Sequence, residues 1–187
     1  MKSILIAVTG GVLGWAASRT VAAPAPAREK VTALGESPSV GASLEDFGFI
    51  VGSWSGTVKG FATPRMPKAF ESPGRMTSRW GPQHAWIETE STMELPGLGP
   101  YAVKVVVRFD RRAKVFDSFV VNTAGNGVRY SGKRTGNGLV FIGTIGDVTQ
   151  RVTYENVSPR ELRFVVEESD DGGATYHPHS ETLWKRS

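Results

Sequence analysis

The sequence predicts an all-β protein: a single up-and-down antiparallel β-barrel of about ten strands, with a short helix before the first strand. From Gly52 onward, runs rich in Val, Ile, Phe, Trp and Thr alternate with clusters of Gly, Pro, Asn and Asp, which is typical of strands and turns. Short connections, such as residues 110–113, indicate hairpins. Because the strands are half polar and no helices can cover them, a sheet that closes on itself would bury the apolar face. A β-sandwich is the alternative.

Residues 1–22 have the order of a secretory signal peptide. Lys2 supplies a positive charge, residues 4–17 are uncharged and mostly apolar, and small residues follow. The apolar run is shorter than the roughly 20 residues that cross a membrane as a helix. Residues 23–43 are rich in Pro, Ala and Ser without apolar periodicity, which predicts a flexible linker. We therefore expect an exported protein, periplasmic or secreted, whose folded domain covers residues 44–187.

Composition excludes several kinds of site and partner. The chain contains no cysteine, so disulfides, zinc–thiolate sites, iron–sulfur ligation and thiol nucleophiles are excluded. The formal net charge is +4, and it falls to +2 when residues 1–22, which hold Lys2 and Arg19 and no acidic residue, are removed. So small a charge gives no reason to expect a nucleic-acid partner. No integral membrane segment is expected after signal removal.

The elements follow in order along the chain. Leu44, Phe47 and Ile50 form one apolar stripe, which predicts a short helix over 43–51 with Ser43 as its cap. The ten expected strands cover residues 52–62, 73–81, 84–95, 100–110, 114–123, 127–134, 138–145, 148–156, 161–169 and 174–186.

Alternation along these strands predicts which side chains face inward. Val103, Val105 and Val107 share one face of their strand, and Lys104 and Arg108 lie on the other. Inward side chains that mix aromatics with Ser and Thr suit a mostly apolar pocket with a few polar groups. The residues expected to line a ligand cavity are Val58, Met76, Ser78, Trp80, Thr89, Ser91, Met93, Val105, Phe141, Phe164 and Thr182. The long connection 63–72 is a candidate lid over the mouth.

Three phrases of the sequence resemble known barrels. The phrase LEDFGFIVGSWSGTVKG, a short helix followed by G-x-W, resembles the lipocalin-like (calycin) barrels, and its further glycine resembles the nitrobindin-related branch and the bacterial domain-of-unknown-function 1579 family. The phrases VVVRFDRRAKVFDSFVVN and DDGGATYHPHSETLWKRS are similar to a central hairpin and the closing strand of that last family. The resemblance covers residues 44–187 and implies a barrel; the family has no established activity.

The resemblance also implies roles for two parts of the last strand. A basic residue there packs over the first-strand tryptophan in calycins, so Arg186 is expected to stack on Trp54 and close the barrel. Nitrobindin-like barrels carry a haem-ligating histidine on the last strand, which makes His179 the alternative haem ligand. With Arg186 facing inward, strict alternation places His177 and His179 outward, so haem is an alternative and no cofactor is predicted.

The rest of the sequence contains few candidates for a catalytic or charged binding site. No catalytic motif is recognisable: GSWSG at 52–56 lacks the strand-to-helix turn of a nucleophile elbow. Glu88, Glu90 and Glu94 share the outward face of one strand, and the basic residues 108–114 are interpreted as a solvated turn. The sequence therefore favours reversible binding of a small hydrophobic or amphipathic ligand. The alternatives are a haem-binding barrel and an envelope interaction or structural module with a filled core.

Overall fold

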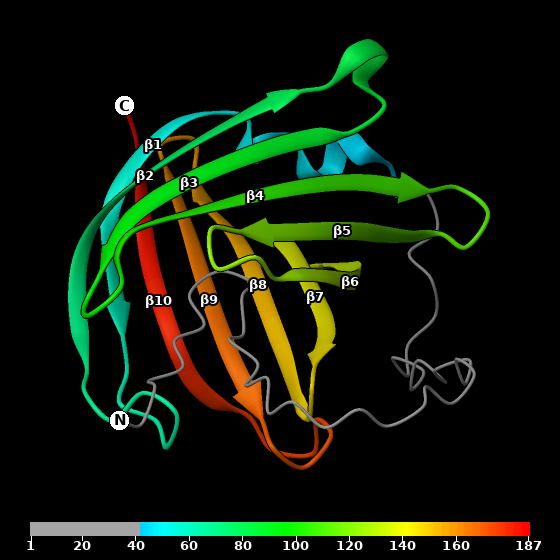
Figure 1. Cartoon of the computed structure of the whole chain (residues 1–187). Coiled ribbons are helices and arrows are strands. Elements are labelled where there is room, and N and C mark those ends of the chain that lie inside the picture. Colours follow the sequence, from blue (N-terminus) through cyan, green and yellow to red (C-terminus); the bar gives the residue numbers. More distant parts are fainter. Residues whose placement is uncertain (1–41) are drawn as a thin grey trace.

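The computed structural model describes residues 42–187, which form one closed barrel of ten antiparallel strands (Figure 1). Each strand pairs with its neighbours in sequence, and the first strand pairs with the last, so the topology is up-and-down without a crossover. This confirms the predicted fold class and rules out the sandwich. The predicted signal peptide and residues 23–41 of the predicted linker lie outside the described residues.

The strands agree with the predicted ranges to within a few residues. They are β1 (Gly52–Gly60), β2 (Phe70–Trp80), β3 (Ile87–Leu95), β4 (Gly99–Asp110), β5 (Val115–Asn122), β6 (Gly127–Thr135), β7 (Gly138–Ile145), β8 (Val148–Ser158), β9 (Glu161–Ser169) and β10 (His177–Arg186).

Two strands, β3 and β10, start three residues later than predicted, for local reasons. Residues 84–86 were expected in β3, but Pro82 opens a single helical turn, η2 (Pro82–His84), and β3 begins only after it. Residues 174–176 were expected in β10, but they belong to the turn after β9. In both places the local turn geometry replaces the alternation that predicted a strand.

The short predicted helix is present as the 3₁₀ helix η1 (Leu44–Ile50), and it covers one end of the barrel. The side chains of Leu44, Phe47 and Ile50 are buried in the common core. The Phe47 ring packs edge-on against Tyr154 at 5.1 Å and Phe141 at 5.8 Å between ring centres. The apolar stripe of η1 therefore closes this end of the barrel. No helix among residues 42–187 is long and apolar enough to cross a membrane.

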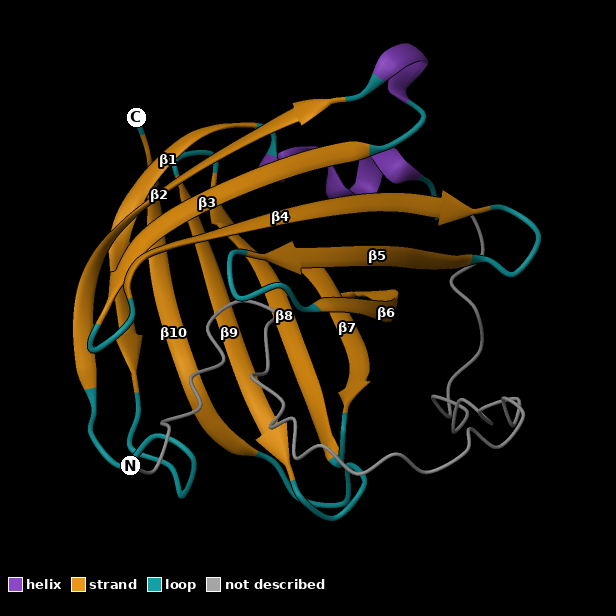
Figure 2. Cartoon of the chain, viewed as in Figure 1, coloured by secondary structure: helices purple, strands orange, loops and turns teal. Residues whose placement is uncertain are grey.

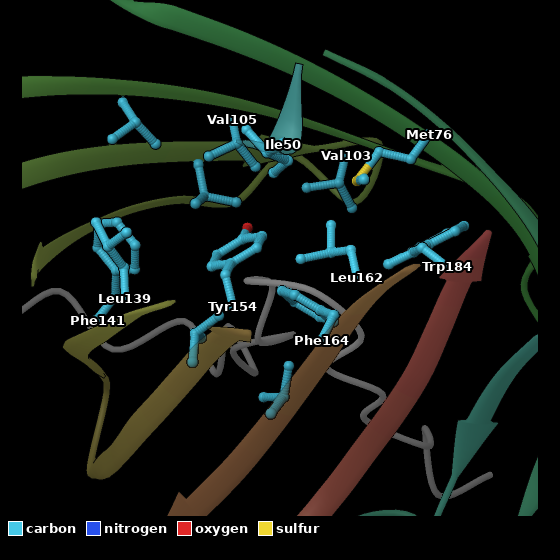
Figure 3. Packing of buried hydrophobic residues seen from close by; sticks show 14 of the residues in the cluster. Ile50, Met76, Val103, Val105, Leu139, Phe141, Tyr154, Leu162, Phe164 and Trp184 are labelled. Atoms are coloured by element: carbon cyan, nitrogen blue, oxygen red, sulfur yellow. The ribbon is translucent and has the colours of Figure 1, made fainter. Parts of the chain in front are cut away.

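The core lies inside the barrel, between two facing walls. Side chains of β8, β9 and β10, among them Tyr154, Phe164 and Trp184, meet those of β2 and β4, such as Met76 and Val105 (Figure 3). The alternation read from the sequence holds along β4, where the inward valines are buried and Lys104 is exposed. The interior is closely packed with aromatic and β-branched residues.

The barrel is closed where β1 meets β10, through Trp54 and Arg186 as expected. The two residues are paired in register, and the guanidinium carbon of Arg186 lies 4.2 Å from the Trp54 ring centre. Trp54 is 2% exposed, and its indole N–H donates to the carbonyl of Ile50 at 2.7 Å. A side chain at Gly52, whose φ is +136°, would place its Cβ 2.2 Å from Nη1 of Arg186. Glycine is therefore required there.

We predict that Trp54→Ala lowers the free energy of unfolding by about 3–5 kcal/mol, because it leaves a cavity and removes the surface on which Arg186 stacks. Urea denaturation followed by circular dichroism measures this loss. Trp86→Ala is the matched control, since the Trp86 ring is only partly buried and should cost less. Equal losses for the two variants would contradict the closing role of Trp54.

Candidate functional site

A chain of polar side chains crosses the interior of the barrel on β6, β8, β9 and β10. The Tyr130 hydroxyl donates to Oε1 of Gln150 at 2.6 Å, and Nε2 of Gln150 donates to Oε1 of Glu168 at 2.9 Å. Nδ1 of His179 lies 3.5 Å from Oε2 of Glu168. That separation is long for a hydrogen bond but suits an ion pair if the imidazole is protonated. All four side chains are buried.

The inward position of His179 corrects the sequence prediction. Strict alternation placed both His177 and His179 outward, and His177 is indeed exposed, but His179 is 1% exposed. The cause is an irregularity in the pairing of β10 with β9, between Pro178 and Ser180. A bulge of this kind adds one residue to a strand and turns the following side chains to the other face. His179 and Ser180 therefore both point inward.

Four consecutive inward residues of β10 carry buried polar atoms without a hydrogen-bond partner among the described residues. We call His179, Ser180, Thr182 and Trp184 the β10 polar stripe. The atoms without any partner among residues 42–187 are Nε2 of the imidazole, the two hydroxyl oxygens and the indole nitrogen, while Nδ1 of the imidazole makes no hydrogen bond but lies 3.5 Å from Glu168. Buried polar groups in proteins nearly always have a partner, which can be ordered water or a ligand. The stripe therefore marks where an additional hydrogen-bonding group would be stabilised.

Burial and neighbouring charges set the protonation of the polar chain. Desolvation raises the pKa of the Glu168 carboxyl, but His179, Gln150 and the positive charge of Arg65 lower it by more, so that the pKa lies below its ordinary value. Glu168 is thus an anion at neutral pH. Burial raises the pKa of Tyr130 far above its ordinary value, so its hydroxyl stays protonated and donates.

The residues expected to line a ligand cavity all face the interior, but they do not form one pocket. Val105, Phe141 and Phe164 meet around a small interior cavity of about 20 Å³, which is room for about one water molecule. Trp80 lies instead at the η1 end, half-buried and stacked on His84. The sequence analysis did not name the other residues that line this cavity, although their strands show the same alternation. These residues are Ser118, Val120, Tyr130, Val152 and Tyr154.

The other residues expected to line the ligand cavity either hydrogen-bond to each other or pack in the core. The hydroxyls of Ser78 and Thr89 are 2.8 Å apart and satisfy one another across β2 and β3. Ser91 lies opposite Met76 on one side and Val103 on the other. Val58, Met93 and Thr182 are buried in the same interior. The inner wall formed by β10, β1, β2 and β3 is therefore richer in small and hydroxyl-bearing residues than the aromatic wall opposite.

The connection between β1 and β2, residues 61–69, packs onto the barrel end opposite η1. Met66 is buried in the core cluster, and Nη1 of Arg65 lies 2.6 Å from Oδ1 of Asp170 in the turn after β9. The Phe61 N–H donates to the carbonyl of His179 at 2.9 Å. The sequence suggested residues 63–72 as a lid; residues 70–72 belong to β2, and the rest lies next to the polar chain.

A haem group at His179 does not fit the interior as it is packed. The imidazole supplies an unpartnered Nε2, which is the chemistry that an axial ligand needs. However, that nitrogen is buried, and the 20 Å³ cavity is lined by other residues. A macrocycle could reach His179 only after several core side chains had moved.

Comparison with known proteins supports the architecture. A scan against protein-family models finds no match, and a search of curated protein sequences finds none either. Among solved structures, Rv2717c from M. tuberculosis is 17% identical with a TM-score of 0.60, and the alignment covers 77% of this chain and 96% of that one. The S-type phycobiliprotein lyase CPES from Guillardia theta is 9% identical with a TM-score of 0.54, covering 78% and 93%. These similarities show the fold alone, a closed antiparallel β-barrel.

The lowered pKa of Glu168 makes stability depend on pH. Its stabilising contribution should be present above the ordinary pKa of 4.5 and be lost as the pH falls through the lower pKa of the folded state. Glu168→Gln should therefore be less stable than the wild type at pH 7, and the gap should shrink in acid. Urea denaturation at a series of pH values measures this, with the exposed Glu94→Gln as control. A gap that does not change with pH would contradict the assignment.

Proposed function

We propose that the barrel reversibly binds a small hydrophobic or amphipathic molecule in its interior, without a covalent step. The observation that carries this proposal is the β10 polar stripe, in which buried polar atoms have no partner among the described residues. Each such atom destabilises the closed interior by about 1–3 kcal/mol. A ligand whose polar group pairs with the stripe would recover part of that free energy.

The apolar side chains around the stripe define the remainder of the ligand. Phe164 is paired with Thr182 on the neighbouring strand β9, and Tyr154 and Val105 lie further round the interior (Figure 3). A ligand with an apolar body that packs on these side chains and a polar end that hydrogen-bonds to β10 would match both parts of the interior. The indole nitrogen of Trp184 is only a donor, so the polar end should contain a hydrogen-bond acceptor such as a carbonyl or carboxylate.

Binding requires side chains to move, because the small interior cavity holds only about 20 Å³. Met76 points into the interior (Figure 3), and Met93 is buried on β3 opposite Gly74, which lies beside the Trp184 ring. Unbranched thioether side chains change shape at low cost. The Trp184 ring packs closely on Gly56 and Gly74, where an added Cβ would lie 3.2 and 2.9 Å from it, so the ring has little room to move. We therefore propose that ligand entry displaces the two methionines and not the aromatic wall.

Haem binding is the second candidate: the unpartnered Nε2 of His179 favours it, and it would require several core side chains to move. Glu168 faces Nδ1 of the imidazole, an arrangement that orients axial histidines in metal sites. Native mass spectrometry and an absorption spectrum of protein from its own compartment separate the candidates. A Soret band would support haem, a copurifying small amphipathic molecule would support the main proposal, and an empty protein that also takes up no ligand would support a filled structural module.

We predict that the wild type takes up an uncharged, environment-sensitive apolar dye and that Ser91→Trp abolishes the uptake by filling the interior. Ser91 is buried on β3, whereas its neighbour Thr92 is exposed, so Thr92→Trp adds the same ring on the outside and should leave uptake intact. Fluorescence titration measures binding, and circular dichroism checks the fold. No uptake by the wild type, or unchanged uptake by Ser91→Trp, would refute the proposal.

Export is part of the same proposal and rests on residues 1–22 of the sequence. Signal-peptide cleavage after Ala22 or after Ala27 would leave the barrel and most of the linker in the mature protein. We predict that N-terminal sequencing of the mature protein finds a first residue between Ala23 and Arg28. Soluble protein that retains Met1 would contradict export.

A further inference from the structure

A second cavity lies outside the barrel interior, at the end that η1 covers. It has a volume of about 620 Å³ and is bounded by the start of η1, the turn that contains η2, and the turn between β4 and β5. Figure 2 shows the two helical turns at this same end of the molecule. Leu44 and Phe109 form its apolar part, and the side chains of His84, Arg111 and Lys114 form its polar part.

The backbone around this cavity is unusual. Within residues 42–187, the non-glycine residues with positive φ are Gln83, His84 and Lys114, at 54°, 55° and 56°. All three line the cavity, although they come from two different turns. The left-handed region is unfavourable for residues with a Cβ, and such residues gather at functional sites where the surrounding structure holds them. Their convergence on one cavity is the first observation that points to a site.

The His84 imidazole is held in place before any ligand arrives. Its ring stacks on the Trp80 indole with 4.6 Å between ring centres and 10° between planes. The turn is fixed by backbone hydrogen bonds from Gly81 to the Trp86 carbonyl at 2.8 Å and from His84 to the Gly81 carbonyl at 3.1 Å. A fixed side chain loses little conformational freedom on binding, which favours recognition of a small ligand.

The charges in the cavity are mainly positive. Arg111 and Lys114 are both exposed, and neither forms an ion pair with another residue of the described chain. Glu45 is the acidic residue on the wall, and its hydrogen bond with Ser43, together with the nearby His84 and Arg111, holds its pKa below the ordinary value. Glu45 therefore offsets one of the two permanent positive charges and leaves the other available.

We propose that this cavity is a binding site for an amphipathic anion, whose carboxylate or phosphate group lies between Arg111 and Lys114 and receives a hydrogen bond from His84. Its short apolar part packs on Leu44 and Phe109. The site is separate from the barrel interior and does not depend on ligand binding there. The sequence alone indicated only a solvated basic turn, because η1 and η2 approach that turn only in the folded barrel.

The test is an NMR titration of the isotopically labelled full chain. Octanoate and octyl phosphate should shift the amides of residues 43–45, 83–85 and 109–114, and octanol, which lacks the charge, should not. A larger response to octyl phosphate would identify phosphate as the preferred head group, and a larger response to octanoate would identify carboxylate. Inorganic phosphate alone should bind more weakly because it lacks the apolar part.

Variants make the assignment specific. Arg111→Gln combined with Lys114→Asn should weaken octanoate binding by about tenfold, because two charge-assisted contacts are lost and Asn tolerates the left-handed backbone at position 114. Lys68→Gln is the control, since Lys68 is exposed at the other end of the barrel and carries the same charge. Ser91→Trp should leave the octanoate-induced shifts of residues 43–45, 83–85 and 109–114 unchanged, because these residues lie outside the barrel interior. Shifts confined to interior residues, or equal affinity in the double variant, would overturn the proposal.

Discussion

The contact of Arg186 with Trp54 is the constraint on which the closed barrel depends. The guanidinium lies over the indole and also donates to the carbonyls of Val51, Phe49 and Pro159, so one side chain joins β10 to η1, to the start of β1 and to the turn between β8 and β9. Gly52 has no side chain, and this leaves room for the Arg186 guanidinium.

The closing contact makes the two ends of the barrel physically different. Around Trp54 the end is sealed by the apolar stripe of η1, with backbone carbonyls satisfied by Arg186. At the opposite end the interior is polar: Glu168 and His179 lie under residues 61–69, and Arg65 bridges to Asp170. One end thus supplies stability, and the other concentrates buried groups that are only partly satisfied. Such a division is common where a rigid frame carries a binding site.

The sequence predicted the fold well because the signals for a barrel are local. Alternation along single strands and short turns between them are visible without knowing the partner strand, and they placed Val103 and Phe164 inside correctly. The motif around Trp54 added the closing contact through its resemblance to calycins.

The site was harder to predict, because its geometry depends on irregularities and on distant strands. The bulge after Pro178 reverses the direction of His179, and alternation alone cannot reveal it. Tyr130, Gln150 and Glu168 lie on three strands and meet only in the closed barrel. The inward-facing residues were identified, but their close packing, which reduces the cavity to about 20 Å³, depends on side-chain shapes that no strand pattern contains.

The pairing of β1 with β10 also has a consequence for synthesis. Every strand pairs with a neighbour in the chain, but the second partner of β1 is β10, which is made more than a hundred residues later. Until then the outer edges of the growing sheet expose unpaired backbone groups, the feature that promotes association between unfinished chains. Completion of the last strand is therefore the step that protects the nascent protein from aggregation.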